Sequence, residues 1–156
     1  MAHFHSTVSE RSVYLRYFHM MNLDCRVAHE RLRRICFVDH DRETVLVAER
    51  HNPQTAQREI VAVGRLSKAP QANVAEFALL ISDAFHGHGL GTELLRELIQ
   101  VARQQNLSGL TADILPENDH MLRICRSLGF RLCYSLEEHV VKAELQLGAG
   151  SAVLGG

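Results

Sequence analysis

Several absences in the sequence exclude whole classes of protein. Tryptophan is absent, and the four cysteines, Cys25, Cys36, Cys125 and Cys133, form no CxxC pair and no other spacing typical of zinc ligands. This pattern indicates neither a structural zinc site nor a disulfide framework. It favours free thiols in a reducing cytoplasm.

Long apolar runs and an excess of one charge are also missing. No apolar run approaches the roughly 18 residues that cross a bilayer, and the start, MAHFHSTV, lacks the apolar segment of a secretory signal. Lys and Arg number 17 against 18 Asp and Glu, and apart from Arg31, Arg33 and Arg34 the basic residues are dispersed. We therefore expect neither a membrane nor a nucleic-acid partner, and a cytoplasmic location.

The composition is that of one globular domain. The chain has 156 residues, of which 46% are apolar, so it is long enough to bury a single core. We expect this domain over residues 1–147. The ending GAGSAVLGG carries no periodic pattern, so we expect a flexible tail over 148–156.

Hydrophobic periodicity predicts an α/β domain. A capping box from Thr7 to Glu10 predicts a helix near 8–21, and helical spacing predicts a second helix over 25–37. Later patterns predict strands over 44–49, 58–67, 73–82, 110–115, 130–135 and 140–147, with helices over 90–105 and from the PEND cluster to Leu128. This order favours a mixed sheet with helices packed against it.

The stretch FHGHGLGTELL, residues 85–95, lies between an apolar strand and the long predicted helix. At such a junction the first helical amides lack intrahelical partners and the helix dipole favours an anion, as in phosphate sites. Gly87, Gly89 and Gly91 would let a pyrophosphate approach those amides. The loop is neither a Walker loop nor GxGxxG, because no GK[ST] follows and the glycines alternate.

The loop resembles the acyl-CoA loop of the GCN5-related N-acetyltransferase (GNAT) superfamily, commonly Gln/Arg-x-x-Gly-x-Gly/Ala. Gly89 and Gly91 match its glycines, and His86 stands where Gln or Arg is usual. The element order over about residues 58–146 matches as well, and PENDHMLRICRSLGF resembles the second acyl-CoA motif. More narrowly, SERSVYLRYFH, DHDRETVLVAE and AEFALLISDAFHGHGLGTELL resemble the acetyltransferase domain of bacterial Pat-type protein-lysine acetyltransferases, a domain often fused to another.

This resemblance implies a fold and a ligand. The fold is a single GNAT-like domain, a mixed and mostly antiparallel sheet of about six or seven strands flanked by about four helices. One central strand would splay from its neighbour, and the pantetheine of acetyl-CoA would bind in the gap, near the backbone of Leu80, Ile81 and Ser82 and beside Asn118. The pyrophosphate would lie on the loop, whose implied binding residues are His86, Gly87, His88, Gly89, Leu90, Gly91 and Thr92.

Acetyl transfer to an amine also needs a base, because the attacking nitrogen must be neutral and a lysine amine has an unperturbed pKa of about 10.4. Glu76 interrupts the apolar run VAEFALLI, where a carboxylate is rarely buried without a partner. It also aligns with the glutamate base of Pat-type enzymes. The alternative is that Glu76 lies at the exposed start of the strand or pairs with an arginine.

The general acid is less clear from the sequence. Many members of the superfamily have a tyrosine four residues before the glycine of the LGF-like turn, and here Cys125 occupies that position. A thiol could protonate the departing thiolate, but a helical cysteine is also a common small core residue. Coenzyme A could instead leave as a thiolate and take its proton from water.

His86 and His88 allow three interpretations. They could bind a metal, but their loop offers no third ligand nearby in sequence, so we expect no metal. One of them could lie beside phosphate and titrate with it, since negative charge favours the imidazolium. Both could also be exposed and without a role.

The sequence therefore predicts an acetyl-CoA-dependent N-acetyltransferase. The acceptor would be a primary amine, in particular a protein lysine, which attacks the thioester directly with Glu76 as general base. A small-molecule amine acceptor and a non-catalytic acyl-CoA sensor remain alternatives, since a fold does not determine a function. A homodimer is left open.

Overall fold

The computed structural model describes residues 2–9, 11–12 and 42–148. The strands and helices predicted between residues 44 and 147 all form, with slightly different ends. In chain order the elements are α1 Ala2–Ser6, β1 Glu43–His51, β2 Arg58–Lys68, β3 Val74–Ile81, the 3-10 turn η1 Asp83–Phe85, α5 Leu90–Gln104, β4 Gly109–Ile114, α6 Asp119–Ser127, β5 Arg131–Ser135 and β6 Val140–Gln146.

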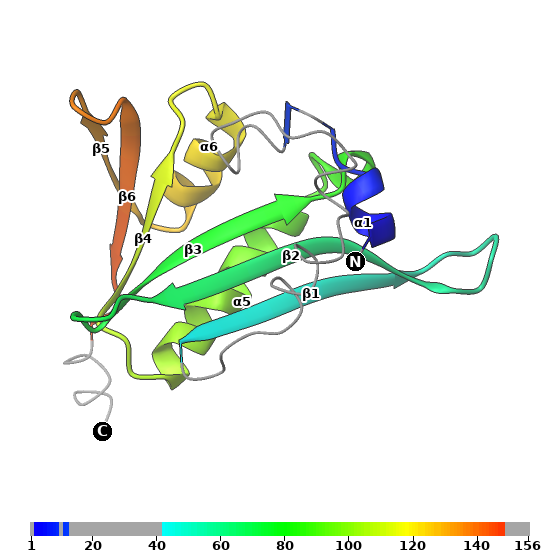
Figure 1. Cartoon of the computed structure of the whole chain (residues 1–156), viewed down its shortest axis with the longest axis horizontal. Coiled ribbons are helices and arrows are strands. Elements are labelled where there is room, and N and C mark those ends of the chain that lie inside the picture. The colour runs from blue at the N-terminus through cyan, green and yellow to red at the C-terminus, as the bar shows by residue number, and fades with distance from the viewer. Residues whose placement is uncertain (1, 10, 13–41, 149–156) are drawn as a thin grey trace.

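The six strands form one mixed sheet in the order β1-β2-β3-β4-β6-β5 (Figure 1). Neighbouring strands are antiparallel except for β3 and β4, which are parallel. The predicted mixed, mostly antiparallel sheet is therefore confirmed, and three α-helices accompany it among the described residues.

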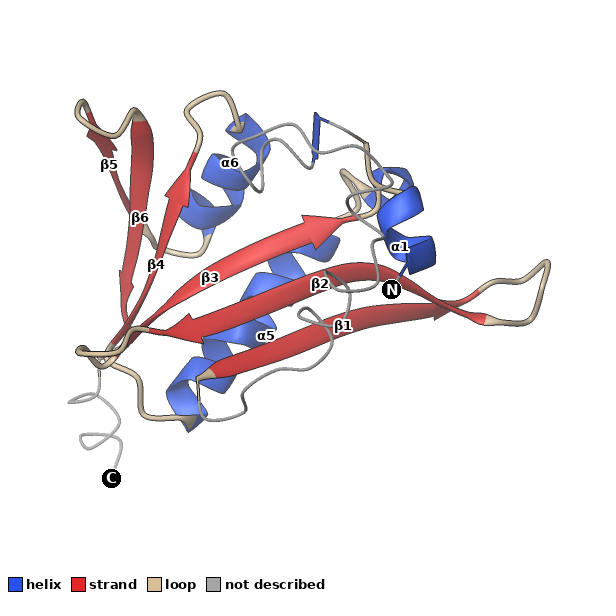
Figure 2. Ribbon diagram, in the orientation of Figure 1, coloured by secondary structure: helices blue, strands red, loops and turns tan. Residues whose placement is uncertain are grey.

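Helices pack on both faces of the sheet. In Figure 2, α5 crosses behind β1, β2 and β3, and its fully buried Leu95 and Leu98 belong to one core with Phe77 and Leu79 of β3. Leu80 points to the opposite face, where it joins a smaller cluster with α1, because successive strand residues point to opposite faces. Each fully buried leucine contributes about 1.5–3 kcal/mol relative to an exposed one.

The sheet opens between its two central strands. β3 and β4 pair only over residues 74–76 and 109–111, although β3 continues along β2 to Ile81 and β4 continues along β6 to Ile114. Figure 1 shows the two strands together at one end and far apart at the other. The splay implied by the resemblance is present.

The N-terminal segment differs from the prediction. Thr7 does not cap a helix starting at residue 8. Its Oγ1 donates to the Phe4 carbonyl oxygen at 2.6 Å and closes α1, a local bond that competes with capping. The cap lies two residues later, where Ser9 Oγ accepts from the Ser12 N–H at 3.1 Å and Arg11 is helical. The remainder of the predicted helix over 8–21, the helix over 25–37 and the tail from 149 fall outside the described residues.

Candidate functional site

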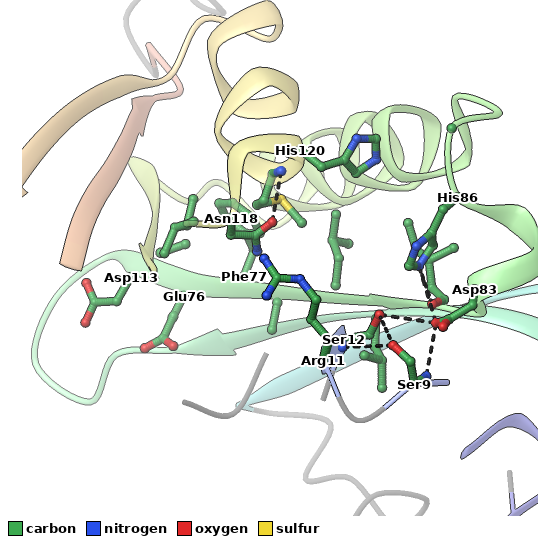
Figure 3. Close-up of a pocket in the computed structure, with 18 residues that line it drawn as sticks. Ser9, Arg11, Ser12, Glu76, Phe77, Asp83, His86, Asp113, Asn118 and His120 are labelled. Carbon is green, nitrogen blue, oxygen red and sulfur yellow. Dashed lines mark hydrogen bonds and ion pairs between the residues drawn. The ribbon is translucent and has the colours of Figure 1, made fainter. Parts of the chain in front are cut away.

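A cavity of about 630 Å³ occupies the opening between β3 and β4, a volume typical of small-molecule sites. Figure 3 shows its walls: the two strands, the start of α6, the loop after β3, and a short segment near Ser12. The residues predicted from the sequence that line it are Glu76, Leu80, Ile81, His86, Gly87 and Asn118. Ser82, His88, Gly89, Leu90, Gly91 and Thr92 lie in the adjoining loop and the first turn of α5.

The backbone of β3 presents alternate residues to the opening. Ser82 N–H donates to a β2 carbonyl oxygen at 2.8 Å, so the backbone of Ser82 faces β2. His86 Nε2 lies 2.9 Å from the Ile81 carbonyl oxygen, which therefore faces the other way. Since this alternation has a period of two, the polar backbone groups along the opening belong to Leu79 and Ile81, and those of Leu80 point to β2. Of the three backbone positions implied by the resemblance, Ile81 faces the gap.

The three loop glycines have two different roles. Gly87 and Gly89 have φ angles of 76° and 79°, a conformation that glycine adopts without strain. Gly89 is the N-cap of α5 and makes no side-chain cap hydrogen bond, so the first amides of α5 can meet a ligand. At Gly91 a Cβ would lie 2.9 Å from the Cδ1 atoms of both Ile81 and Ile124. Gly91 therefore allows α5 to pack against its neighbours, and its part in phosphate access stays a prediction.

Asn118 caps a helix and also lines the cavity. It is the N-cap of α6, and its Oδ1 accepts from Met121 N–H at 3.3 Å, which explains why the PEND cluster starts a helix. The same side chain lines the cavity. Its amide NH2 group is the part that a ligand can use.

Glu76 lies where β3 and β4 separate, because its pairing with Thr111 is the last of their ladder. Its side chain is exposed and lines the cavity, and among the described residues no arginine pairs with it. Figure 3 places Glu76 and Asp113 at one end of the cavity and His86 at the other. An exposed carboxylate at the point of divergence can exchange a proton with a group that enters the opening.

Cys125 is in a different environment. It is fully buried in the main core and is not among the residues that line the cavity. Burial raises the pKa of its thiol to about 12, because a thiolate is poorly solvated there. We therefore correct the catalytic assignment of Cys125: the residue packs in the core.

A second set of residues in the cavity was missed from the sequence. Ser9, Arg11, Ser12, Asp113 and His120 line it. The Asp83 carboxylate accepts from Ser9 N–H at 3.1 Å and from Ser12 Oγ at 3.2 Å, and so ties the N-terminal segment to the end of β3. The signal for Arg11 and His120 was their position inside the two stretches SERSVYLRYFH and PENDHMLRICRSLGF.

The described residues contain no group of three or more His, Cys, Asp or Glu side chains that could hold a metal ion. They also contain no helix long and apolar enough to cross a membrane.

Known proteins share this architecture. The GNAT domain of S. lividans PAT is 26% identical with a TM-score of 0.80, over 93% of this chain and 82% of that one. A domain from Methanocaldococcus jannaschii is 14% identical with a TM-score of 0.71, over 91% and 88%. A cAMP-binding acyltransferase from Mycobacterium smegmatis is 24% identical with a TM-score of 0.59, over 70% of this chain and 33% of that one.

A family model described as the acetyltransferase (GNAT) family matches residues 12–130. The matched range contains β3, the loop after it, β4 and α6, whose residues line the cavity, and also α5. Enzymes of this family use acetyl-CoA as co-substrate. From the family match, the fold and the splayed sheet, we conclude that this chain belongs to the acetyltransferase (GNAT) family.

Proposed function

We propose that this protein transfers the acetyl group of acetyl-CoA to the side-chain amine of a protein lysine, with Glu76 as general base. The observation that carries the proposal is the position of Glu76, exposed in the cavity at the residue where β3 and β4 part. We also propose that residues 1–147 form this one catalytic domain.

The coenzyme would lie along β3. Its pyrophosphate would meet the first amides of α5 beside Gly89, where the helix dipole and the free N–H groups favour an anion. Its pantetheine would follow the open edge of β3 and pair with the backbone of Leu79 and Ile81, as a strand would. Glu76 is six positions before Ser82, so about 20 Å of extended chain separates the phosphate end from the proposed base. A long flexible arm is the kind of ligand that can connect the two.

The reaction then needs two protons to leave the nitrogen and one bond exchange at the carbonyl carbon. Glu76 takes a proton from the lysine ammonium, directly or through water, and the neutral nitrogen attacks the thioester carbonyl carbon. The new C–N bond forms as the C–S bond breaks, and coenzyme A leaves as a thiolate. The nitrogen loses its second proton to water as the amide forms. With Cys125 buried in the core, we propose that the thiolate also takes its proton from water.

Two observations support a protein acceptor over a small amine. The domain is 26% identical to the GNAT domain of S. lividans PAT over most of both chains, in keeping with the Pat-like stretches of the sequence. Glu76 is also exposed, so a lysine on the surface of a folded protein can reach it with its long side chain.

The test compares acceptors and one substitution. The protein is incubated with acetyl-CoA and either folded proteins or free amines, and release of coenzyme A is followed together with acetylation by mass spectrometry. Glu76→Gln keeps the shape of the side chain and removes the base, so we expect acetyl-CoA binding to persist and the rate to fall by roughly 100-fold or more. Turnover on free amines without turnover on proteins would refute the lysine acceptor.

A further inference from the structure

Asp113 and Glu76 present two carboxylates at one end of the cavity. Both line the cavity, and Figure 3 shows them together at the end away from His86. Thr111 is the partner of Glu76 across the sheet, and Asp113 follows Thr111 by two residues on β4. Because alternate residues of a strand share a face, Asp113 lies on the same face of the sheet as Glu76, about 7 Å further along β4 than Thr111. The proposed reaction leaves Asp113 without a role.

Asp113 already binds an ammonium group of this chain. Lys142 is its partner on β6, and Lys142 Nζ donates to Asp113 Oδ1 at 3.4 Å. Glu138 in the β5–β6 turn holds the same ammonium, with 2.5 Å between Lys142 Nζ and Glu138 Oε2. The hydrogen bond to Glu138 raises the pKa of Lys142, and the Asp113 carboxylate adds to this effect, so Lys142 is a cation at neutral pH. A basic side chain therefore occupies this position beside the cavity in the free protein.

The contact with Lys142 leaves Asp113 open to a second cation. The side chains of Lys142 and Asp113 are 41% and 46% exposed, and ion pairs at such positions are weak because water screens the charges. Lys142 contacts only Oδ1, and no other described residue bonds to this carboxylate. Both oxygens of a carboxylate can accept hydrogen bonds. A basic side chain that arrives from solvent can therefore compete with Lys142 for Asp113.

We propose that Asp113 selects acceptor lysines that have a second basic residue close by, and that it binds this second side chain while the target lysine lies at Glu76. This selection, which rests on the proposed function, narrows the acceptor to basic segments of a protein. Residues two positions apart on an extended chain are about 7 Å apart and face the same way. This separation equals the offset between Asp113 and Thr111, the partner of Glu76. An arginine or lysine two positions from the target therefore matches the two carboxylates.

A purely structural role for the ion pair predicts a different result. If Asp113 and Lys142 only join β4 to β6, then Asp113→Asn and Lys142→Gln remove the same contact and should act in the same direction. If Lys142 competes with the acceptor, the two changes act in opposite directions, because one removes the binding carboxylate and the other removes its competitor. The direction of the two effects therefore distinguishes acceptor recognition from structural support.

The experiment measures kcat/KM for acetyl transfer to two synthetic peptides, each with blocked ends and a single lysine. One peptide has arginine two positions after the lysine and the other has glutamine there. Arginine supplies a permanent cation, and the lysine remains the one acceptor amine in each peptide. The proteins are the wild type, Asp113→Asn, Lys142→Gln and Glu49→Gln. Glu49 is the matched control, because it forms an exposed ion pair with Arg58 between β1 and β2, 3.9 Å apart, and is not among the residues that line the cavity.

We expect the wild type to prefer the arginine peptide by about two- to fivefold in kcat/KM at low salt, the range that corresponds to one exposed ion pair. The preference should shrink at high salt, because salt screens exposed charges. The ratio of the two kcat/KM values should fall to about one in Asp113→Asn and should rise in Lys142→Gln by a similar factor. The Glu49→Gln protein should show the ratio of the wild type.

Three results would overturn the inference and leave the proposed function intact: equal kcat/KM for the two peptides in the wild type, an unchanged ratio in Asp113→Asn, or a ratio that does not rise in Lys142→Gln. Transfer to neither peptide by a wild-type protein that acetylates folded proteins would also overturn it, because the selection concerns two side chains of one short segment. A wild-type protein that acetylates neither the peptides nor folded proteins would refute the proposed function, and this inference with it.

Discussion

Substitution of Gly91 tests whether the absence of a side chain at this position allows the first turn of α5 to pack against the core. In Gly91→Ala the new Cβ would lie 2.9 Å from the Cδ1 atoms of Ile81 and Ile124, and both isoleucines are buried, 7% and 5% exposed. Crowding of a packed core costs about 1–3 kcal/mol. Replacing glycine by alanine inside a helix offsets about 0.8–1 kcal/mol of this cost. We therefore expect net destabilisation of about 1 kcal/mol.

The assay is thermal unfolding of the variant beside the wild type. A loss of about 1 kcal/mol lowers the Tm of a domain of this size by about 2–4 °C. Ile124→Val removes one of the two Cδ1 atoms that Gly91→Ala would meet, so the double variant should be more stable than the sum of the two single changes predicts. A rise in Tm for Gly91→Ala alone, or strict additivity in the double variant, would refute the packing role.

Three further predictions concern single residues. The backbone of Gly89 is in the left-handed region, with a φ of 79°, which is strained for alanine. Gly89→Ala should therefore weaken coenzyme A binding measured by calorimetry, whereas Gly91→Ala should leave binding nearly unchanged. Asn118→Ala removes the cap of α6 and should lower the unfolding free energy by about 1 kcal/mol in a denaturant titration; an unchanged midpoint would contradict the capping role. The pKa of the buried Cys125 thiol is raised to about 12, so this residue should stay protonated and resist alkylation in the native protein near neutral pH. The exposed Cys133 should react, and peptide mass spectrometry would show the difference. Modification of both cysteines at equal rates would argue against the buried position of Cys125.

The sequence predicted the elements well where periodicity was strong. The alternation over 140–147 and the wide apolar stripe over 90–105 each match the structure, β6 and α5, because burial on one face imposes these patterns. The glycine loop was also predicted between a strand and a helix, and it lies between β3 and α5. The capping box at Thr7 was wrong because the cap lies at Ser9, whose Oγ accepts from the Ser12 N–H, and residues 8 and 9 are not helical.

The site was predicted less completely, for reasons that depend on tertiary contacts. Alternation along β3 shows which side chains share a face. The edge of the strand that each backbone N–H and C=O faces depends instead on the register with β2. The sequence prediction of backbone groups that face the opening therefore included Leu80 and missed Leu79. Gly91 looks like its neighbours in sequence, and its packing against Ile124 appears only once α6 is in place. Arg11 and His120 come from segments that are far apart along the chain, and only the fold brings them to one cavity.

The central claim is that Glu76 removes a proton from an amine that attacks acetyl-CoA bound between β3 and β4. The most direct measurement is the rate of acetyl transfer to a folded protein by the wild type, by Glu76→Gln, and by Glu97→Gln, which changes an exposed carboxylate on α5, with acetyl-CoA affinity determined for each. We predict equal affinity in all three and a rate reduced roughly 100-fold or more in Glu76→Gln alone. Wild-type turnover in the Glu76 variant, or no transfer by the wild type despite tight acetyl-CoA binding, would contradict this mechanism.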